Sequence, residues 1–279
     1  MDIVVFGAML ASAFLHAVWN AWAKSRRDSN AAIAALVIGA GIPNIAVIAA
    51  LGWPAAPAWP WIACTVALSI AALTLLGAAY REGDFAVAFP MIRGLIPVVL
   101  VVAAVPLFAE APTLFGTLGV ACVSAGLLLI GWEAARRTRT VTLKGLALIA
   151  LAAAVTAASV LTDAKGSRLG GNPLVYAATI AFLNGVVMAV LQALRGRRVD
   201  RMLVREWPIT IFAALVSIVS YQLYIWSLQQ APVALVSAMR ETSMLFALLI
   251  ALVILRERFG LWRWLAVGLM LGGLALMRL

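Results

Sequence analysis

V-A-L-V-S-A-M-R-E-T-S-M-L-F (Val233–Phe246) is the stretch from which the class of this fold follows. It lies within an apolar run from Pro232 to Leu255, which is long enough to cross a lipid bilayer as a helix. Arg240 and Glu241 interrupt this run at a depth where water does not solvate a charge. The stretch therefore raises two questions: what kind of chain carries these charges, and which groups neutralise them.

The composition answers the first question. Of the 279 residues, 65% are hydrophobic and 11% are charged, and the mean hydropathy is +1.06. A soluble domain carries about 25% charged residues, so this chain is expected to be an integral membrane protein with no sizeable soluble domain. The net charge of +10 would suggest nucleic acid as a partner of a soluble protein, but here we interpret it as a signal of membrane orientation and expect no nucleic acid.

A membrane-spanning helix needs about 20 apolar residues. The chain contains ten such runs, and we place helices at residues 3–23, 31–51, 60–80, 85–108, 113–131, 144–164, 172–194, 208–228, 232–255 and 260–277. The sequence thus predicts an all-α integral membrane fold with ten transmembrane helices and the lipid bilayer as its surroundings.

Basic residues predict the orientation of these helices. Sixteen of the 21 Lys and Arg residues follow odd-numbered helices, whereas the opposite side holds only Lys165, Arg168 and Arg278. Because basic loops stay in the cytoplasm, we expect both termini on the extracytoplasmic side of the cell (inner) membrane.

The two halves of the chain resemble each other. A shift of 147 residues aligns Glu110 with Glu257, and it also aligns Arg93 with Arg240. We therefore divide the chain into a first five-helix repeat (1–131), a basic connecting loop (132–143) and a second five-helix repeat (144–279). Because five is odd, the second repeat enters the membrane from the opposite side. Inverted repeats of this kind are typical of transporters with a site near the bilayer midplane.

Three stretches carry a family resemblance: H-A-V-W-N-A-W-A-K (His16–Lys24), Y-R-E-G-D-F-A-V-A-F-P-M-I-R-G (Tyr80–Gly94) and A-M-R-E-T-S (Ala238–Ser243). With these stretches and its ten helices, the chain resembles the EamA-type permeases of the drug/metabolite transporter superfamily over its whole length. The resemblance implies transport but no single substrate, since the superfamily carries cations, amino acids, sugars and phosphorylated compounds. Small multidrug members have a glutamate in their first helix; this chain has His16 there, which argues against simple efflux of cationic drugs.

Arg93 and Arg240 are the main candidate substrate-binding residues. Each lies about eight residues, or about 12 Å, into its helix, and the two helices enter from opposite faces of a core about 30 Å thick. Both side chains should approach the midplane, where a guanidinium fork matches a carboxylate, phosphate or phosphonate group. The alternative is a structural brace, in which Arg93 pairs with Glu241 and Arg240 caps carbonyls near a kink. Adjacent helical residues point about 100° apart, so Glu241 is directed to another helix rather than to Arg240.

The first helix supplies further candidates. His16 and Asn20 lie on one polar face, with Trp19 beside them, and all three are predicted to contact substrate. His16 and Glu241 are also candidates for proton coupling, because each can change its protonation state. Ordinary packing is the alternative for His16 and Trp19.

Tyrosines complete the predicted site: Tyr80, Tyr176, Tyr221 and Tyr224. Tyr221 and Tyr224 stand out because they lie on a serine-lined face of the eighth helix. Asp163, in contrast, is interpreted as a surface ion pair with Lys165 near a helix end.

The predicted function is secondary transport of a small anionic or zwitterionic metabolite by alternating access. The alternatives are proton-coupled efflux of cationic or amphipathic compounds and a membrane-embedded lipid enzyme. An enzyme of that kind needs clustered carboxylates, metal ligands or a nucleophile with its base, which the sequence does not offer. We therefore expect no enzyme activity, no cofactor and no metal. Gly268-x-x-x-Gly272 permits close helix contact, within the chain or in a homodimer through the last helix of either repeat.

Overall fold

The computed structural model describes residues 1–26, 28–82, 84–110, 112–138, 142–196, 206–253 and 259–279. Within these ranges it contains ten helical spans that are long and apolar enough to cross a membrane, and it contains no β-strand. The all-α membrane fold with ten spans is thereby confirmed. Glu257, which the repeat aligns with Glu110, lies outside the described residues, as do the basic residues of 197–205.

The helices follow the predicted order, with one span divided in two. Their bounds are α1 (Ile3–Lys24), α2 (Ser29–Leu51), α3 (Trp59–Glu82) with a short 3₁₀ turn before it (Ala56–Ala58), α4 (Phe85–Phe108), α5 (Leu114–Thr138), α6 (Leu143–Leu169), α7 (Pro173–Leu194), α9 (Trp207–Gln230), α10 (Val233–Glu241), α11 (Ser243–Val253) and α12 (Leu261–Arg278).

Helix α5 is longer than the sequence predicted. It continues to Thr138, into the segment that was expected to form the connecting loop. The extension contains the helix formers Glu, Ala and Arg, and Glu133 accepts a bond of 2.6 Å from Arg137 one turn later. The helix therefore projects past the apolar part of its span.

The ninth predicted span is not one continuous helix, because it breaks at Thr242 into α10 and α11. The N–H of Thr242 donates to the Met239 carbonyl at 3.1 Å, a tighter i to i−3 bond, and the Thr242 hydroxyl donates to the same carbonyl at 2.6 Å. A side-chain hydroxyl that competes for a backbone carbonyl weakens a helix locally. The break follows directly after Arg240 and Glu241, so it separates their helix from the rest of the span.

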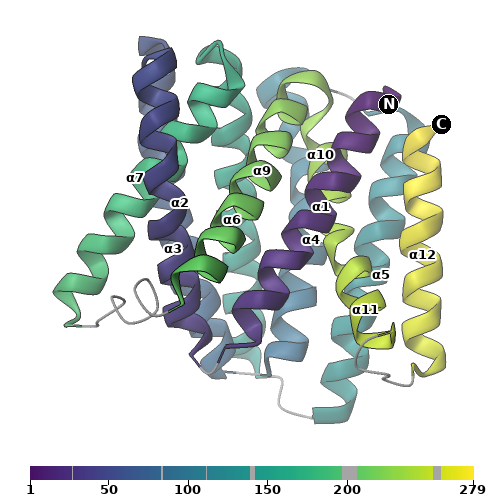
Figure 1. Ribbon diagram of the computed structural model, residues 1–279. Coiled ribbons are helices and arrows are strands. Elements are labelled where there is room, and N and C mark those ends of the chain that lie inside the picture. Colours follow the sequence, from purple (N-terminus) through teal and green to yellow (C-terminus); the bar gives the residue numbers. More distant parts are fainter. Residues whose placement is uncertain (27, 83, 111, 139–141, 197–205, 254–258) are drawn as a thin grey trace.

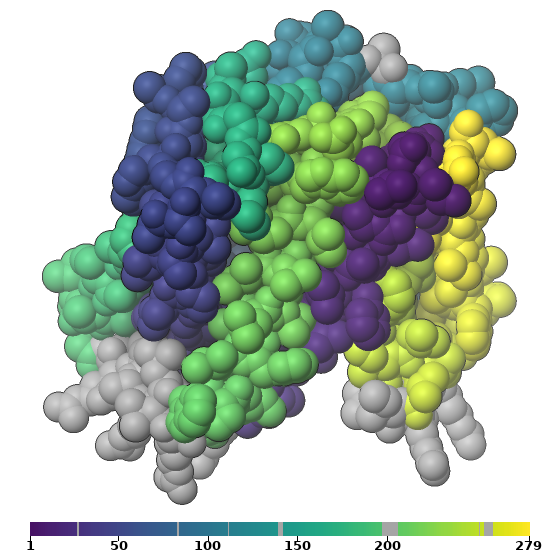
Figure 2. Space-filling view, turned by 45° about the horizontal axis from the view of Figure 1, so that its top comes forward, coloured from purple at the N-terminus to yellow at the C-terminus, as the bar shows by residue number. Residues whose placement is uncertain are grey.

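Both termini lie at the same end of the bundle, as ten spans require (Figure 1). Arg278 at the end of α12 donates to the Met1 carbonyl at 3.2 Å. Helix α1 lies between α9 and α11 on one face (Figure 2). Further pairs of neighbours are α3 with α6, α2 with α7, α4 with both α5 and α6, and α5 with α12.

Glycine allows α5 and α12 to approach closely. A Cβ atom at Gly126 would lie 2.8 Å from the Ala266 carbonyl oxygen, so no side chain fits there. No described atom lies within 4 Å of a Cβ placed at Gly268 or Gly272. The Gly268-x-x-x-Gly272 pair therefore does not make the close contact within the chain, and the homodimer stays a prediction.

Candidate functional site

A cavity of about 730 Å³ lies in the centre of the bundle. This volume is within the range of about 300–1,000 Å³ that is usual for small-molecule sites. Its walls come from α1, α2, α3, α4, α6, α7, α9 and α10, and they include most of the predicted site residues: His16, Trp19, Asn20, Tyr80, Arg93, Tyr221, Tyr224, Arg240 and Glu241.

The cavity opens toward one end of the bundle. Its lining includes Lys24 at the end of α1, Asn30 at the start of α2 and Phe85 at the start of α4, all of which lie at that end. It reaches inward as far as Asp163 on α6 and Arg240 on α10. It is thus accessible from the side opposite to the two termini.

An ion pair joins helices at the other end of the bundle. Arg168 Nη1 lies 2.6 Å from Glu110 Oε1, and the second carboxylate oxygen of Glu110 accepts the N–H of Val233 at 2.8 Å. Arg168 also donates to the Leu228 carbonyl at 2.8 Å. These bonds tie the end of α6 to the α4–α5 connection and to the turn between α9 and α10, which holds this end together.

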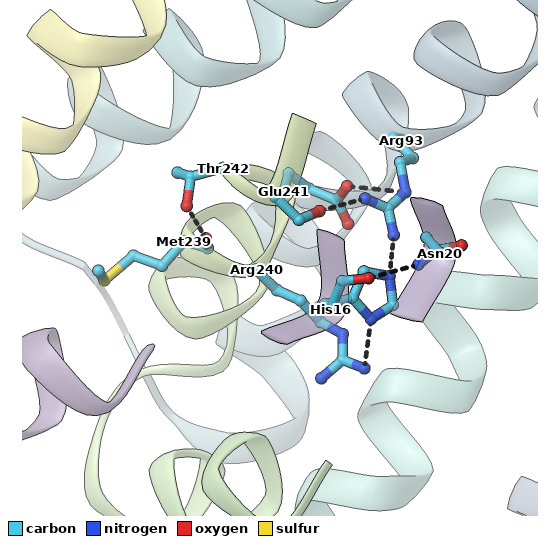
Figure 3. A network of polar contacts seen from close by, with 8 residues as sticks. His16, Asn20, Arg93, Met239, Arg240, Glu241 and Thr242 are labelled. Atoms are coloured by element: carbon cyan, nitrogen blue, oxygen red, sulfur yellow. Dashed lines mark hydrogen bonds and ion pairs between the residues drawn. The ribbon is translucent and has the colours of Figure 1, made fainter. Parts of the chain in front are cut away.

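Arg93 on α4 has a partner for each of its nitrogens (Figure 3). Its Nε forms an ion pair with Glu241 Oε2 at 3.3 Å, its Nη1 donates to Ser243 Oγ at 2.6 Å, and its Nη2 lies 2.7 Å from His16 Nε2. Two of these partners flank the break at Thr242, so the break brings Glu241 and Ser243 to the same guanidinium. Arg93 is therefore held in place by α1 and by both halves of the ninth span.

Arg240 is much less well satisfied. Its Nη2 lies 3.4 Å from His16 Nδ1, and its guanidinium lies over the ring of Tyr224 at 4.0 Å from the centroid, a cation–π contact. Its Nη1 is buried and has no hydrogen-bond partner among the described residues. A buried N–H without an acceptor is costly, so this atom marks a place where an acceptor would bind favourably.

His16 lies between the two arginines and can serve only one of them well (Figure 3). Arginine only donates hydrogen bonds, so the ring nitrogen at 2.7 Å from Arg93 must be an acceptor. The neutral ring then carries its proton on Nδ1, and this N–H faces another donor on Arg240. This tautomer, assigned from the surrounding donors, explains why the contact with Arg240 is the longer one.

The remaining residues of α1 support His16. Trp19 packs edge-on against its ring, with centroids 4.8 Å apart, and the Asn20 side chain donates to the His16 carbonyl at 2.9 Å. Both also line the cavity. The predicted polar face of the first helix is therefore directed into the bundle.

Asp163 corrects the sequence interpretation, because it is not a surface partner of Lys165. It is 5% exposed, lines the cavity, and accepts hydrogen bonds from Tyr221 at 3.0 Å and from Tyr176 at 3.4 Å. Tyr176 is itself fully buried behind Asp163 and is not among the residues that line the cavity. The signal in the sequence was helical spacing: Thr156, Ser159 and Asp163 share one face of α6.

Comparison with known proteins agrees with this architecture. Residues 143–279 match the family model of the EamA-like transporter family. Comparison with curated sequences gives no significant match. The fold is similar to that of a solved protein crystal structure, with a TM-score of 0.75 and 17% sequence identity over 99% of this chain and 96% of the other. The family match over the second half of the chain and the ten apolar helices together support a permease of the drug/metabolite transporter superfamily, EamA type.

Proposed function

We propose that the chain is a secondary transporter for a small anionic or zwitterionic metabolite, and that the central cavity is its substrate site. The observation that carries this proposal is Arg240: its guanidinium borders the cavity, and its buried Nη1 has no described acceptor. An oxyanion in the cavity would satisfy this donor with a charge-assisted hydrogen bond.

The charge of the site supports an anionic group. Three basic residues line the cavity, Lys24, Arg93 and Arg240, against two carboxylates, those of Asp163 and Glu241, and Glu241 is already paired with Arg93. We therefore propose that the two sequence interpretations apply to different residues. Arg93 is the brace, since each of its nitrogens has a described partner, and Arg240 is the clamp, since its Nη1 has none among the described residues.

The two ends of the bundle support alternating access. One end is open to the cavity and the other is tied by Arg168 and Glu110. Eight of the sixteen basic residues counted in the sequence are described, and they lie near helix ends on the open side: Lys24, Arg26, Arg81, Arg136, Arg137, Lys144, Arg195 and Arg263. We therefore propose that this side faces the cytoplasm and that the termini lie outside. In this orientation the cavity would open to the cytoplasm, as in the inward-open state of a transporter.

The helix contacts support an inverted repeat. In such a repeat, α1 corresponds to α6, α3 corresponds to α9, and α4 corresponds to α10 and α11 together. The contact of α3 with α6 then has its counterpart in the contact of α9 with α1, and both contacts are present. Likewise, the contact of α4 with α6 has its counterpart in the contact of α10 and α11 with α1, which is also present. Such a twofold relation lets one arrangement open to either side of the membrane.

Proton-coupled efflux of cations is the second candidate function, and Asp163 is the observation in its favour. A carboxylate that lines the cavity can attract a cationic ligand or carry a proton. Efflux of cations alone does not account for the unsatisfied donor of Arg240.

A ligand screen by thermal unfolding of the purified full-length protein tests the proposal. Because a ligand that binds the native state raises its stability, carboxylates, phosphates, phosphonates and zwitterions should raise the unfolding temperature of the wild type. Arg240→Ala should lose this response, and Arg136→Ala, on the exposed end of α5, should keep it. Stabilisation by organic cations alone would overturn the proposal in favour of cation efflux.

A further inference from the structure

The cavity has a negative pole that the proposed anion site does not use. Asp163 is nine-tenths buried or more, and among the described residues its oxygens receive hydrogen bonds from the neutral hydroxyls of Tyr221 and Tyr176. No lysine, arginine or histidine in the described part of the chain forms an ion pair with it. Glu241, the other acid in the cavity, differs in this respect because Arg93 pairs with it.

The carboxylate of Asp163 has capacity left for a ligand. An ionised carboxylate has about four lone-pair sites, and the two tyrosines use two of them. A carboxylate removed from bulk water without a counter-charge is costly, so a cation that reaches it gains a strong interaction. Because Asp163 lines the cavity, that cation can come from whatever occupies the cavity.

A pair of tyrosines on α9 joins this negative pole to Arg240. Tyr221 donates to Asp163, whereas the ring of Tyr224 lies under the Arg240 guanidinium. The two rings are neighbours, with centroids 6.2 Å apart. The two opposite charges therefore stand at either end of one aromatic wall of the same cavity.

From this arrangement we propose that Asp163 is the ammonium subsite of the transporter, so that its substrate is a zwitterion whose acid group binds Arg240. The inference rests on the proposed function and narrows it from anions or zwitterions to zwitterions. Tyr176 and Tyr221 position the carboxylate, and the aromatic wall contacts the carbon chain between the two charged groups. The separation of Asp163 and Arg240 then selects the spacing of those groups in the substrate.

Matched ligands test this subsite on the wild-type protein. The probes are glycine, β-alanine, γ-aminobutyrate, 5-aminovalerate and leucine, each beside the acid of the same skeleton without its amino group and the amine without its acid group. Binding to the purified full-length protein is measured by calorimetry and by thermal unfolding. Because a hydrogen-bonded ion pair with a buried carboxylate strengthens binding, at least one zwitterion should bind about tenfold more tightly than its deaminated acid.

Each outcome of this series has a distinct meaning. If the acids bind as tightly as the zwitterions throughout, the ammonium subsite is wrong and the anion transporter stands. If only the amines bind, or if no probe binds, the proposed function fails together with the subsite.

Asp163→Asn tests the residue itself. Asparagine keeps the shape and an acceptor for Tyr221 but removes the charge, so the affinity for the preferred zwitterion should fall about tenfold, to that of its deaminated acid. The acid should bind as before or more tightly. The control is Asp84→Asn, the same change at the exposed N-cap of α4, where asparagine also caps well. A zwitterion preference that survives Asp163→Asn would overturn the assignment, and if this variant does not fold, the wild-type series alone decides.

Discussion

The two arginine-bearing spans, α4 and α10–α11, align with each other in sequence at a shift of 147 residues but form different environments. Helix α4 is continuous from Phe85 to Phe108 although it contains three prolines, whereas its counterpart breaks at Thr242. Arg93 has a partner for each of its nitrogens, whereas Arg240 has a long contact with His16, a cation–π contact with Tyr224 and a buried Nη1 without an acceptor among the described residues.

The difference follows from one position. The shift of 147 residues that aligns Arg93 with Arg240 aligns Gly94 with Glu241. A Cβ atom at Gly94 would lie 3.0 Å from Leu128 Cγ and 3.1 Å from the Ser124 carbonyl oxygen, so the packing of α4 on α5 leaves no room for an acid there. The second half thus supplies a carboxylate to Arg93, while the first half supplies none to Arg240. This asymmetry is the basis of our proposal that Arg240 binds the ligand.

The largest expected effect is on transport by Arg240→Ala. If Arg240 is the unsatisfied clamp, its removal should reduce uptake into proteoliposomes at least about 100-fold, since a buried charge-assisted contact to the substrate is lost. The unfolding temperature should stay the same or rise, because a poorly satisfied buried charge is removed. Arg240→Lys keeps the positive charge but lacks the forked guanidinium, so its uptake rate should lie between those of the wild type and of Arg240→Ala. Uptake by Arg240→Ala at the wild-type rate would contradict the comparison.

Arg93→Ala should act on stability. It leaves Glu241 buried without its counter-charge, which costs about 3–5 kcal/mol in the free energy of unfolding. The double variant Arg93→Ala/Glu241→Ala removes both charges and should recover most of this loss, as measured by denaturation of all members of the double-mutant cycle. Additive losses in the double variant would show that the two residues do not act as a brace.

Gly94→Ala should show why the first half carries no acid at this position. The added methyl group must displace the α4–α5 contact, and overpacking of this kind costs about 1–3 kcal/mol of unfolding free energy. Gly77→Ala on α3 is the matched control, because its nearest described neighbour is 3.9 Å away. Alanine favours a helix over glycine, so this control should be neutral or stabilising. Equal effects at both glycines would contradict the packing explanation.

Ser243→Ala gives the smallest expected effect. It removes the hydroxyl that accepts from Arg93 Nη1 just after the helix break, which should cost about 1.5 kcal/mol. Ser237→Ala also changes a buried serine of the same span, but one with no such bond to Arg93, and it should cost less in the same denaturation experiment. A larger loss in Ser237→Ala would mean that the break contributes little to the brace.

Much of the fold was accessible from the sequence because membrane insertion depends on local chemistry. A bilayer requires about 20 apolar residues per span, so the ten runs could be located without knowledge of their neighbours. The break at Thr242 escaped prediction because polar residues within an apolar run do not by themselves show where a helix is interrupted. Two contacts accompany the break. The Thr242 hydroxyl binds the carbonyl of Met239 in the preceding turn, and Arg93 on α4 binds the hydroxyl of Ser243. The second contact depends on a residue far away in the sequence.

The amino-acid order alone predicted a ten-helix membrane protein with charged residues deep within its spans, among them Arg93, Arg240 and Glu241. It could not distinguish a brace from a clamp, and it assigned Asp163 to the surface. Tertiary packing places Asp163 inside the bundle and supports the proposed roles of the two arginines, because burial and hydrogen bonding depend on residues from other helices: Glu241 reaches Arg93, and Tyr176 and Tyr221 contact Asp163. The hydrophobicity of a span is the sum over its own residues, so it can be read from the sequence. The hydrogen-bond partners of a buried charge are residues of other helices that packing places within about 3 Å of it.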